Sequence, residues 1–527
     1  MAKKLIIIGI FLLAFFLRIW NISKYPVSIS MDEAAFGYNA YSILKTGRDE
    51  FGEFLPLAFR SAGDYKPPVD VYLMVPFVWA FGLNEFSIRL PIALLGSLTV
   101  ISFIYLLISF RLSRKASYLG GIWLAISPWH IYYSRGGVGS ISSLFFLITG
   151  VLFFTLWVKR KEFIYPIISA IFLSLSVWAY HAERLFIPLL TVFLIFLFKP
   201  KKKVILFIIV TLIFAIPFIK LAFFTPAISQ RASVTSILSE RSLVNALHNG
   251  NYQNLKERIF DNDIYLVYRH WLGKYLNYYD LRFWFWKGLQ LTPTGYPDLG
   301  LLMVIDLPLI ILGIYSLIKS KNTKLKYLSL FWFFAGPFPA SLTMNEQHPL
   351  RALVWLPFFG IIITSGFEYL LAKFKLKKVL IGYLVLALFN FIYFFDIYIN
   401  QFPRFYSEYW QYGYKQVAIY ACNNKDKYDE IVISDTFGSD GPLNSGLPYL
   451  YMLTFCDWDR QSYLVNGKHQ DKIRFRRAKI EDFERNNIKT LIIGSPWDFV
   501  GELKNKGIII DKIQFKNGKD AFWFVES

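Results

Sequence analysis

Residues 90–115 read LPIALLGSLTVISFIYLLISFRLSRK, an uncharged run of 21 residues that ends in three closely spaced cations. An apolar run of this length is sufficient for a helix that crosses a bilayer, which needs roughly 17 to 25 residues. The same pattern recurs along the chain, and 55% of its 527 residues are hydrophobic. This fraction is above that of ordinary soluble domains. The sequence therefore predicts an α-helical, polytopic membrane protein.

The apolar runs predict about eleven transmembrane helices. They are residues 5–20, 90–110, 116–133, 141–157, 163–178, 185–198, 204–224, 299–318, 327–342, 352–371 and 379–399. No small-residue cleavage site follows the first run, so we interpret it as a retained helix rather than a signal peptide. If residues 69–81 crossed the membrane, the later basic loops would fall on the outer side. We predict that residues 69–81 lie in, or dip into, the outer interface.

Lysine and arginine runs occupy alternate loops, at residues 3–4, 111–115, 159–161, 199–203, 319–326 and 373–378. By the positive-inside rule these loops are cytoplasmic. The outer parts are then residues 21–89, 225–298 and 401–527. The predicted location is the cytoplasmic (inner) membrane, with the carboxyl-terminal part outside.

Hydropathy falls after residue 400, which divides the chain into a membrane module, 1–400, and an extracytoplasmic domain, 401–527. Strand-like runs at 430–434, 490–493, 508–513 and 521–525 alternate with helix-like runs at 406–421 and 482–487. This alternation predicts a small α/β domain.

The net charge of +20 comes mostly from short runs between apolar segments, so it indicates topology rather than nucleic-acid binding. Only two cysteines are present, which excludes a cysteine-rich metal site. Cys422 and Cys456 both lie in the outer domain, where a disulfide can form. Neither their spacing nor any motif requires one.

Acidic, basic and imidazole side chains gather in the predicted outer loops, where ionisable groups near a bilayer usually mark function. Asp32 and Glu33 follow the first span, and a carboxylate there can take a proton from an acceptor hydroxyl. The alternative role is helix capping, because Ser30 and Asp32 are both good N-caps for a predicted amphipathic helix at 34–44. Lys66-Pro67-Pro68 holds a cation near the outer surface, which either binds a phosphate or extends to the interface as lysines commonly do.

Three more outer helix ends carry cations or imidazoles, and each has a simple explanation as an anchor of its helix. Their repetition favours a phosphate site, because several cations converge on it. The candidate substrate-binding residues are Lys66, His130, Arg135, His181, Glu183, Glu346, His348 and Arg351.

In combination these motifs resemble the GT-C membrane glycosyltransferases. The likeness is closest to the bacterial branch related to protein O-mannosyltransferases and lipid A aminoarabinose transferase. It is strongest over residues 1–200. It rests on Ser30-Met31-Asp32-Glu33-Ala34, Gly47-x-Asp49-x-x-Gly52, Lys66-Pro67-Pro68, Phe86-Ser87-Ile88-Arg89-Leu90-Pro91, the run from Ser127 to Arg135, and His348-Pro349-Leu350-Arg351.

The resemblance implies transfer of a sugar from a polyprenyl-phosphate donor to an acceptor hydroxyl at the outer membrane face, with inversion. The acceptor is a protein, a lipid or a glycan. Asp32 matches the family's catalytic carboxylate and Glu33 its neighbour. Lys66 matches a lysine near the donor phosphate, and Arg135 and Arg351 match phosphate partners.

Many relatives carry a second acidic residue where this chain reads GGVGS at 136–140. A divalent metal is therefore not supported by the sequence, and its His and Glu residues are too scattered for a helical zinc motif. No nucleotide-binding fingerprint is present either. One alternative function is a transporter or lipid-carrier flippase, which should show paired repeats and polar groups at mid-membrane. The other is a membrane-anchored binding protein whose outer domain does the work.

Overall fold

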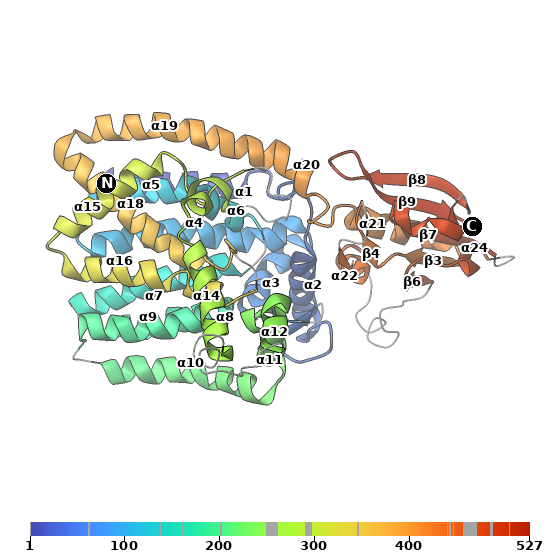
Figure 1. Cartoon of the computed structure of the whole chain (residues 1–527), viewed down its shortest axis with the longest axis horizontal. Coiled ribbons are helices and arrows are strands. Elements are labelled where there is room, and N and C mark those ends of the chain that lie inside the picture. The colour runs from blue at the N-terminus through green and yellow to red at the C-terminus, as the bar shows by residue number, and fades with distance from the viewer. Residues whose placement is uncertain are drawn as a thin grey trace.

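The computed structural model describes residues 2–61, 64–136, 139–160, 162–200, 203–248, 262–289, 298–344, 347–439, 441, 444–445, 447–456, 472–484, 488–504 and 506–527. A large helical body is joined to a smaller domain built around a sheet (Figure 1). The predicted fold class, a polytopic helical protein with a small carboxyl-terminal α/β domain, is confirmed.

Every predicted span contains a helix of the body. These helices are α1 (Ala2–Ile19), α4 (Glu85–Ser109), α5 (Arg114–Ile126), α6 (Pro128–Ser134), α7 (Ser140–Arg160), α8 (Ile164–Ala179), α9 (Glu183–Phe198), α10 (Val204–Phe224), α15 (Asp306–Lys319), α16 (Thr323–Ala335), α17 (Phe338–Ser341), α18 (Leu356–Lys373) and α19 (Leu376–Asp396).

Three predicted spans differ from the observed helices. The span 327–342 is divided between α16 and α17, with Gly336 and Pro337 between them. The span 116–133 is divided into α5 and α6 at Pro128, whose missing N–H interrupts the helical hydrogen bonds. The span 299–318 becomes helical only at Asp306, whose carboxylate accepts a hydrogen bond from the Met303 N–H. Within the described residues, five helices are long and apolar enough to cross a membrane by length and composition. The number of crossings therefore stays a prediction.

The basic loops gather at one end of the body, away from the sheet domain (Figure 1). Arg111, Lys159, Lys321 and Lys324 come from three different predicted cytoplasmic loops or helix ends, yet they line one pocket. Loops that the sequence assigns to one side of the membrane by their charge therefore lie together in the structure.

Short elements lie between the long helices. α2 (Met31–Thr46), α3 (Val69–Phe81), α11 (Ala227–Thr235) and α12 (Arg241–His248) lie toward the sheet domain, and α14 (Asp263–Asn277) lies across the middle of the body (Figure 1). The others are β1 (Phe59–Ser61), β2 (Asp64–Lys66), η1 (Ile237–Ser239), η2 (Phe283–Lys287) and η3 (Leu353–Trp355). The predicted helix at 34–44 is α2. It is not amphipathic, because every residue from Ala34 to Ala40 is buried. α3 packs on α2 and α4 and buries Asp70 and Met74, so it is part of the body.

A continuous helical segment, Leu376–Tyr406, runs through the predicted domain boundary at residue 400. It comprises α19, η4 (Ile397–Gln401) and α20 (Phe402–Tyr406). The sheet domain follows, with strand order β6-β3-β7-β9-β8. β3 is parallel to β6 and β7, and β9 is antiparallel to β7 and β8.

The four predicted strands are β3 (Glu430–Ile433), β7 (Thr490–Gly494), β8 (Ile508–Gln514) and β9 (Asp520–Glu526). The sequence reading missed β6 (Ile473–Phe475) and the short pair β4 (Thr436–Phe437) and β5 (Asn444–Ser445). The predicted helix 406–421 starts only at Tyr414, as α21 (Tyr414–Asn424), and that at 482–487 overlaps α24 (Glu481–Glu484), with residues 485–487 outside the described residues. A disulfide joins Cys422 of α21 to Cys456 at the end of α22 (Pro448–Phe455).

Candidate active site

The first turn of α2 carries Asp32 and is fixed by a capping box. Ser30 Oγ accepts a hydrogen bond from the Glu33 N–H at 3.3 Å, and Glu33 Oε2 accepts one from the Ser30 N–H at 2.9 Å. Ser30 is thus the N-cap, which decides between the two caps that the sequence allowed. The Asp32 side chain, 35% exposed, is left for other contacts.

Lys66 is the partner of Asp32. It ends β2 directly before Pro67, and a residue before proline favours the extended backbone that a strand needs. Its Nζ lies 3.0 Å from Asp32 Oδ1 and 3.6 Å from Asp64 Oδ2. The catalytic and phosphate-binding candidates of the sequence, 34 positions apart, are therefore in direct contact.

Further cations surround this pair. Arg231 of α11 forms an ion pair with Asp64, and Arg351 forms a hydrogen bond with the Tyr180 side chain. We call Lys66, Arg184, Arg231 and Arg351 the cation cluster, because all four act electrostatically on His181. Among the described residues, Lys66 and Arg231 form ion pairs with Asp32 and Asp64, so the four cations of the cluster outnumber the carboxylates paired with them.

The histidines of the site stay neutral. Burial, followed by the charges of Arg184, Arg231, Lys66 and Arg351, lowers the pKa of His181 well below its ordinary value. Burial, followed by the charges of Arg351 and Arg231, lowers the pKa of His348 to about 3. Near neutral pH these imidazoles therefore act as hydrogen-bonding groups, and the positive charge comes from lysine and arginine.

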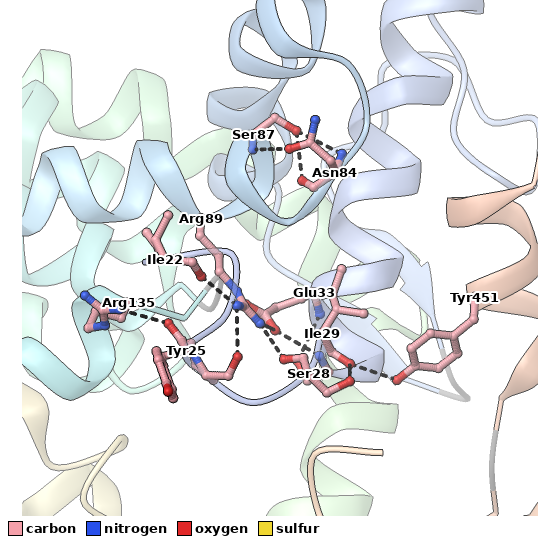
Figure 2. Close-up of polar contacts among 12 residues, drawn as sticks. Ile22, Tyr25, Ser28, Ile29, Glu33, Asn84, Ser87, Arg89, Arg135 and Tyr451 are labelled. Carbon is pink, nitrogen blue, oxygen red and sulfur yellow. Dashed lines mark hydrogen bonds and ion pairs between the residues drawn. The ribbon is translucent and has the colours of Figure 1, made fainter. Parts of the chain in front are cut away.

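Glu33 belongs to the scaffold. The Arg89 guanidinium holds it with two bonds, from Nε to Oε1 at 2.7 Å and from Nη2 to Oε2 at 3.0 Å (Figure 2). Both side chains are fully buried. Arg89 Nη1 also donates to the Ile22 carbonyl at 2.9 Å, so it fixes the loop before α2. Since both oxygens of Glu33 are occupied, its contacts explain a structural role and do not support a catalytic one.

Arg135 also differs from its predicted role. Its guanidinium donates to the carbonyls of Leu17, Arg18, Trp20 and Tyr25 and to the Tyr398 hydroxyl. The residue is 2% exposed. These bonds satisfy carbonyls at the end of α1 that lack helical partners, so Arg135 closes that helix and has no donors left for a phosphate.

Two other candidates are buried in the helical body. His130 Nδ1 lies 2.6 Å from Arg18 Nη2, and Glu183 Oε1 accepts a hydrogen bond from Ser143 Oγ at 2.6 Å. Their exposed fractions are 0% and 2%. We assign both to packing between helices rather than to substrate binding. Glu346 lies outside the described residues.

The structure adds Asp64 and Arg231 to the site. It also brings in Tyr180 and Arg184, which flank the candidates His181 and Glu183 in the sequence. Asp64 had a local signal, because residues two apart on a strand share a face and Asp64 therefore accompanies Lys66. Arg231 had none, since it lies in a long aromatic-rich segment and reaches the site only through tertiary packing.

Among the described residues, no group of three or more His, Cys, Asp or Glu is placed to hold a metal ion. Asp32 faces the Lys66 ammonium, and Asp64 faces Lys66 and Arg231. Because side-chain cations already neutralise these carboxylates, the set does not fit a divalent ion.

Residues 65–221 match the family described as dolichyl-phosphate-mannose-protein mannosyltransferase. The fold is similar to that of ArnT from Cupriavidus metallidurans bound to undecaprenyl phosphate, with a TM-score of 0.55 over 99% of this chain and 97% of that chain, at 10% identity. Residues 65–221 are thus similar to this mannosyltransferase family, and the chain as a whole shares the fold of ArnT. The GT-C fold predicted from the motifs is confirmed.

A second similar structure is the oligosaccharyltransferase of Archaeoglobus fulgidus in complex with zinc and sulfate. It shows 14% identity and a TM-score of 0.48 over 81% of this chain. This chain spans 60% of the length of that protein. No curated protein sequence matches the chain.

Proposed function

We propose that this protein transfers a sugar from a polyprenyl-phosphate donor to an acceptor hydroxyl at the outer face of the cytoplasmic membrane, with inversion. The carrying observation is the contact of Asp32 with Lys66 at 3.0 Å inside the cation cluster. It unites a candidate base with a candidate phosphate site. The relationship to the mannosyltransferase family over residues 65–221 supports the same class of reaction.

The charge of the cation cluster suits this chemistry. A sugar linked to a polyprenyl phosphate is a phosphodiester with one negative charge, and the departing polyprenyl phosphate carries up to two. Cations fixed at the site stabilise the charge that develops as the bond to the sugar breaks. Lys66, Arg231 and Arg351 come from three separate elements, so they can contact one phosphate from several sides.

An apolar groove of about 650 Å³ suits the lipid part of such a donor. Pro68, Tyr72, Trp178 and Pro217 are among the residues that line it. Pro68 is two residues from Lys66. The chain segment that carries Lys66 therefore continues into one wall of the groove, and we propose that a donor with a charged head and a long hydrocarbon chain spans the two.

In the proposed reaction, Asp32 takes the proton of the acceptor hydroxyl while that oxygen attacks C1 of the sugar. The bond from C1 to the phosphate oxygen breaks, and polyprenyl phosphate leaves. Lys66 is shared between Asp32 and Asp64 before donor binds. A donor phosphate competes for the same ammonium, and Asp32 is then less strongly paired and a better base.

The distribution of charge supports an outer active site. Arg111 and Lys159 line a basic pocket together with the loop between α15 and α16. That loop lies at the end of the body away from the sheet domain (Figure 1). If the basic end is cytoplasmic, Asp32 and residues 401–527 are extracytoplasmic. This arrangement also favours a transferase over a flippase, for which charges at mid-membrane are expected.

The test is to incubate the purified protein in detergent with a panel of radiolabelled polyprenyl-phosphate sugars and candidate acceptors. Micelles have no two sides, so a flippase gives no chemical change, whereas a transferase gives labelled product or slow donor hydrolysis. We expect turnover with at least one donor. Absence of turnover, together with donor movement across reconstituted vesicles, would contradict the proposal.

A further inference from the structure

The amino terminus of α2 is held by the carboxyl-terminal domain as well as by its own capping box. The first N–H groups of a helix lack partners inside the helix. The Met31 N–H donates to Gln411 Oε1 at 3.0 Å, across 380 positions of sequence. Met31 directly precedes Asp32, so this contact bears on the placement of the proposed base.

Tyr451 of α22 strengthens the contact. Its hydroxyl donates to Gln411 Oε1 at 2.8 Å and also lies 3.2 Å from the Ile29 carbonyl (Figure 2). Its ring is fully buried and stacks on Tyr414 at 5.3 Å. Burial, with smaller contributions from Tyr414, Glu33 and Asp32, raises the pKa of Tyr451 well above its ordinary value. The hydroxyl therefore remains a donor at any working pH.

The backbone of Gln411 is itself strained. Its φ of +53° lies in the left-handed region, which is unfavourable for a residue other than glycine. Such a conformation persists only where the surroundings enforce it. Gln411 is 6% exposed, and its N–H donates to the Glu408 carbonyl. The strained backbone aims the amide at the start of α2.

The elements that carry these two side chains are covalently tied. Gln411 lies just before α21, Tyr451 lies in α22, and the Cys422–Cys456 disulfide joins the two helices. α22 also packs directly against α2. The support for Met31 is thus a stiff unit rather than a single flexible side chain.

We propose that Gln411 and Tyr451 are positioning residues of the active site, through which the carboxyl-terminal domain holds Asp32 in its working geometry. This inference rests on the proposed role of Asp32. It makes the outer domain a structural part of the catalytic centre, whatever else that domain binds. A misplacement of about 1 Å can lower a rate on the order of 100-fold, so one lost anchor is measurable.

The first variant is Gln411→Leu, which keeps the size and removes the acceptor. We expect kcat to fall about 10- to 100-fold with little change in the donor KM, because Lys66 is on a different element. Gln411→Glu keeps an acceptor and should recover much of kcat. Its charge near Asp32 should also move the pH–rate profile, which a purely structural role would not. Gln416→Leu on α21 is the matched control and should keep the full rate.

A double-variant cycle separates the inference from the proposed function. In an Asp32→Asn background, Gln411→Leu should cause no further loss, because the group that it positions is gone. Equal losses in both backgrounds, or an unchanged kcat in Gln411→Leu, would overturn the inference. Full activity of Asp32→Asn would overturn the proposed function instead.

If Gln411→Leu does not fold, Tyr451→Phe serves in its place, because it removes one oxygen from a packed ring. We expect a fall in kcat of about tenfold, the equivalent of one hydrogen bond. A wild-type kcat in a folded Tyr451→Phe protein would overturn the role of Tyr451.

Discussion

Two groups of arginines in the predicted outer loops and helix ends look alike in the sequence and differ in their contacts. Arg89 and Arg135 are 0% and 2% exposed and donate to Glu33 or to backbone carbonyls. Arg231 keeps 25% of its side chain exposed and, with Arg351, belongs to the cation cluster. The first group holds the loop that leads to Asp32, and the second surrounds the place where a phosphate would bind.

The difference teaches that position near the membrane surface does not make a cation a ligand. A guanidinium whose donors are all used by the protein cannot bind substrate without breaking the fold. A cation in a cluster with surplus charge can exchange a weak partner for a phosphate. Substitutions in the two groups should therefore change different quantities.

The largest expected effect is on stability. Arg89→Leu leaves the Glu33 carboxylate buried without its ion-pair partner, which typically costs about 3–5 kcal/mol. The free energy of unfolding in detergent should fall by this amount. The double variant with Glu33→Leu should recover a large part of it. A single variant as stable as the wild type would show that the pair does not hold the loop.

Arg135→Leu should give a smaller net loss of stability, because it leaves neutral carbonyls rather than a buried charge without a partner. Several buried carbonyls at the end of α1 lose their donor, and each unsatisfied group costs about 1–3 kcal/mol before water or local rearrangement compensates. Thermal unfolding should report the loss, and the donor KM of the surviving protein should equal that of the wild type. A selective rise in donor KM would return Arg135 to the phosphate site.

Lys66→Ala and Arg351→Ala should show the opposite behaviour. Each removes a charge-assisted contact worth about 1.5–3 kcal/mol, so the donor KM should rise roughly 10- to 150-fold while the melting temperature changes little. Lys425→Ala, at the surface of the carboxyl-terminal domain, is a control for charge alone. If the donor KM of Lys66→Ala equals that of the wild type, Lys66 does not bind the donor phosphate.

The smallest effect concerns pH. The folded protein keeps His348 neutral down to a pKa of about 3, whereas an unfolded histidine takes up a proton near pH 6.5. Between these values the unfolded state binds more protons, so stability falls as pH falls, by up to about 1.4 kcal/mol per pH unit. Denaturation at pH 5 and 7 should show a weaker dependence in His348→Gln. An identical dependence would mean that His348 titrates normally.

The sequence predicted what depends on local pattern. Apolar runs placed the long helices, and alternating loop charge predicted which of their ends lie together. The motif around Asp32 and Lys66 correctly brought these two residues into one site. The sequence was less informative where tertiary contacts decide. Arg135 and Arg351 both lie near predicted helix ends, and only the fold shows that the donors of Arg135 are used by the carbonyls at the end of α1. Arg231 lies 165 positions from Lys66 and has no motif of its own.

The capping alternative shows the same limit. Ser30 and Asp32 are both good N-caps by residue type. The choice of Ser30 follows from the bond between Glu33 and the Ser30 N–H, and Glu33 is in turn fixed by Arg89 from another helix. A distant contact therefore decides which residue caps α2 and which is left for chemistry.

Asp32→Asn tests the central claim most directly. Asparagine keeps the size of the side chain and removes the charge and the basicity, and because Ser30 caps α2, the variant should fold. The account predicts normal unfolding and a transfer rate about 100- to 10,000-fold below the wild type, the usual contribution of a positioned acid or base. Near wild-type transfer by a well-folded Asp32→Asn protein would contradict the account.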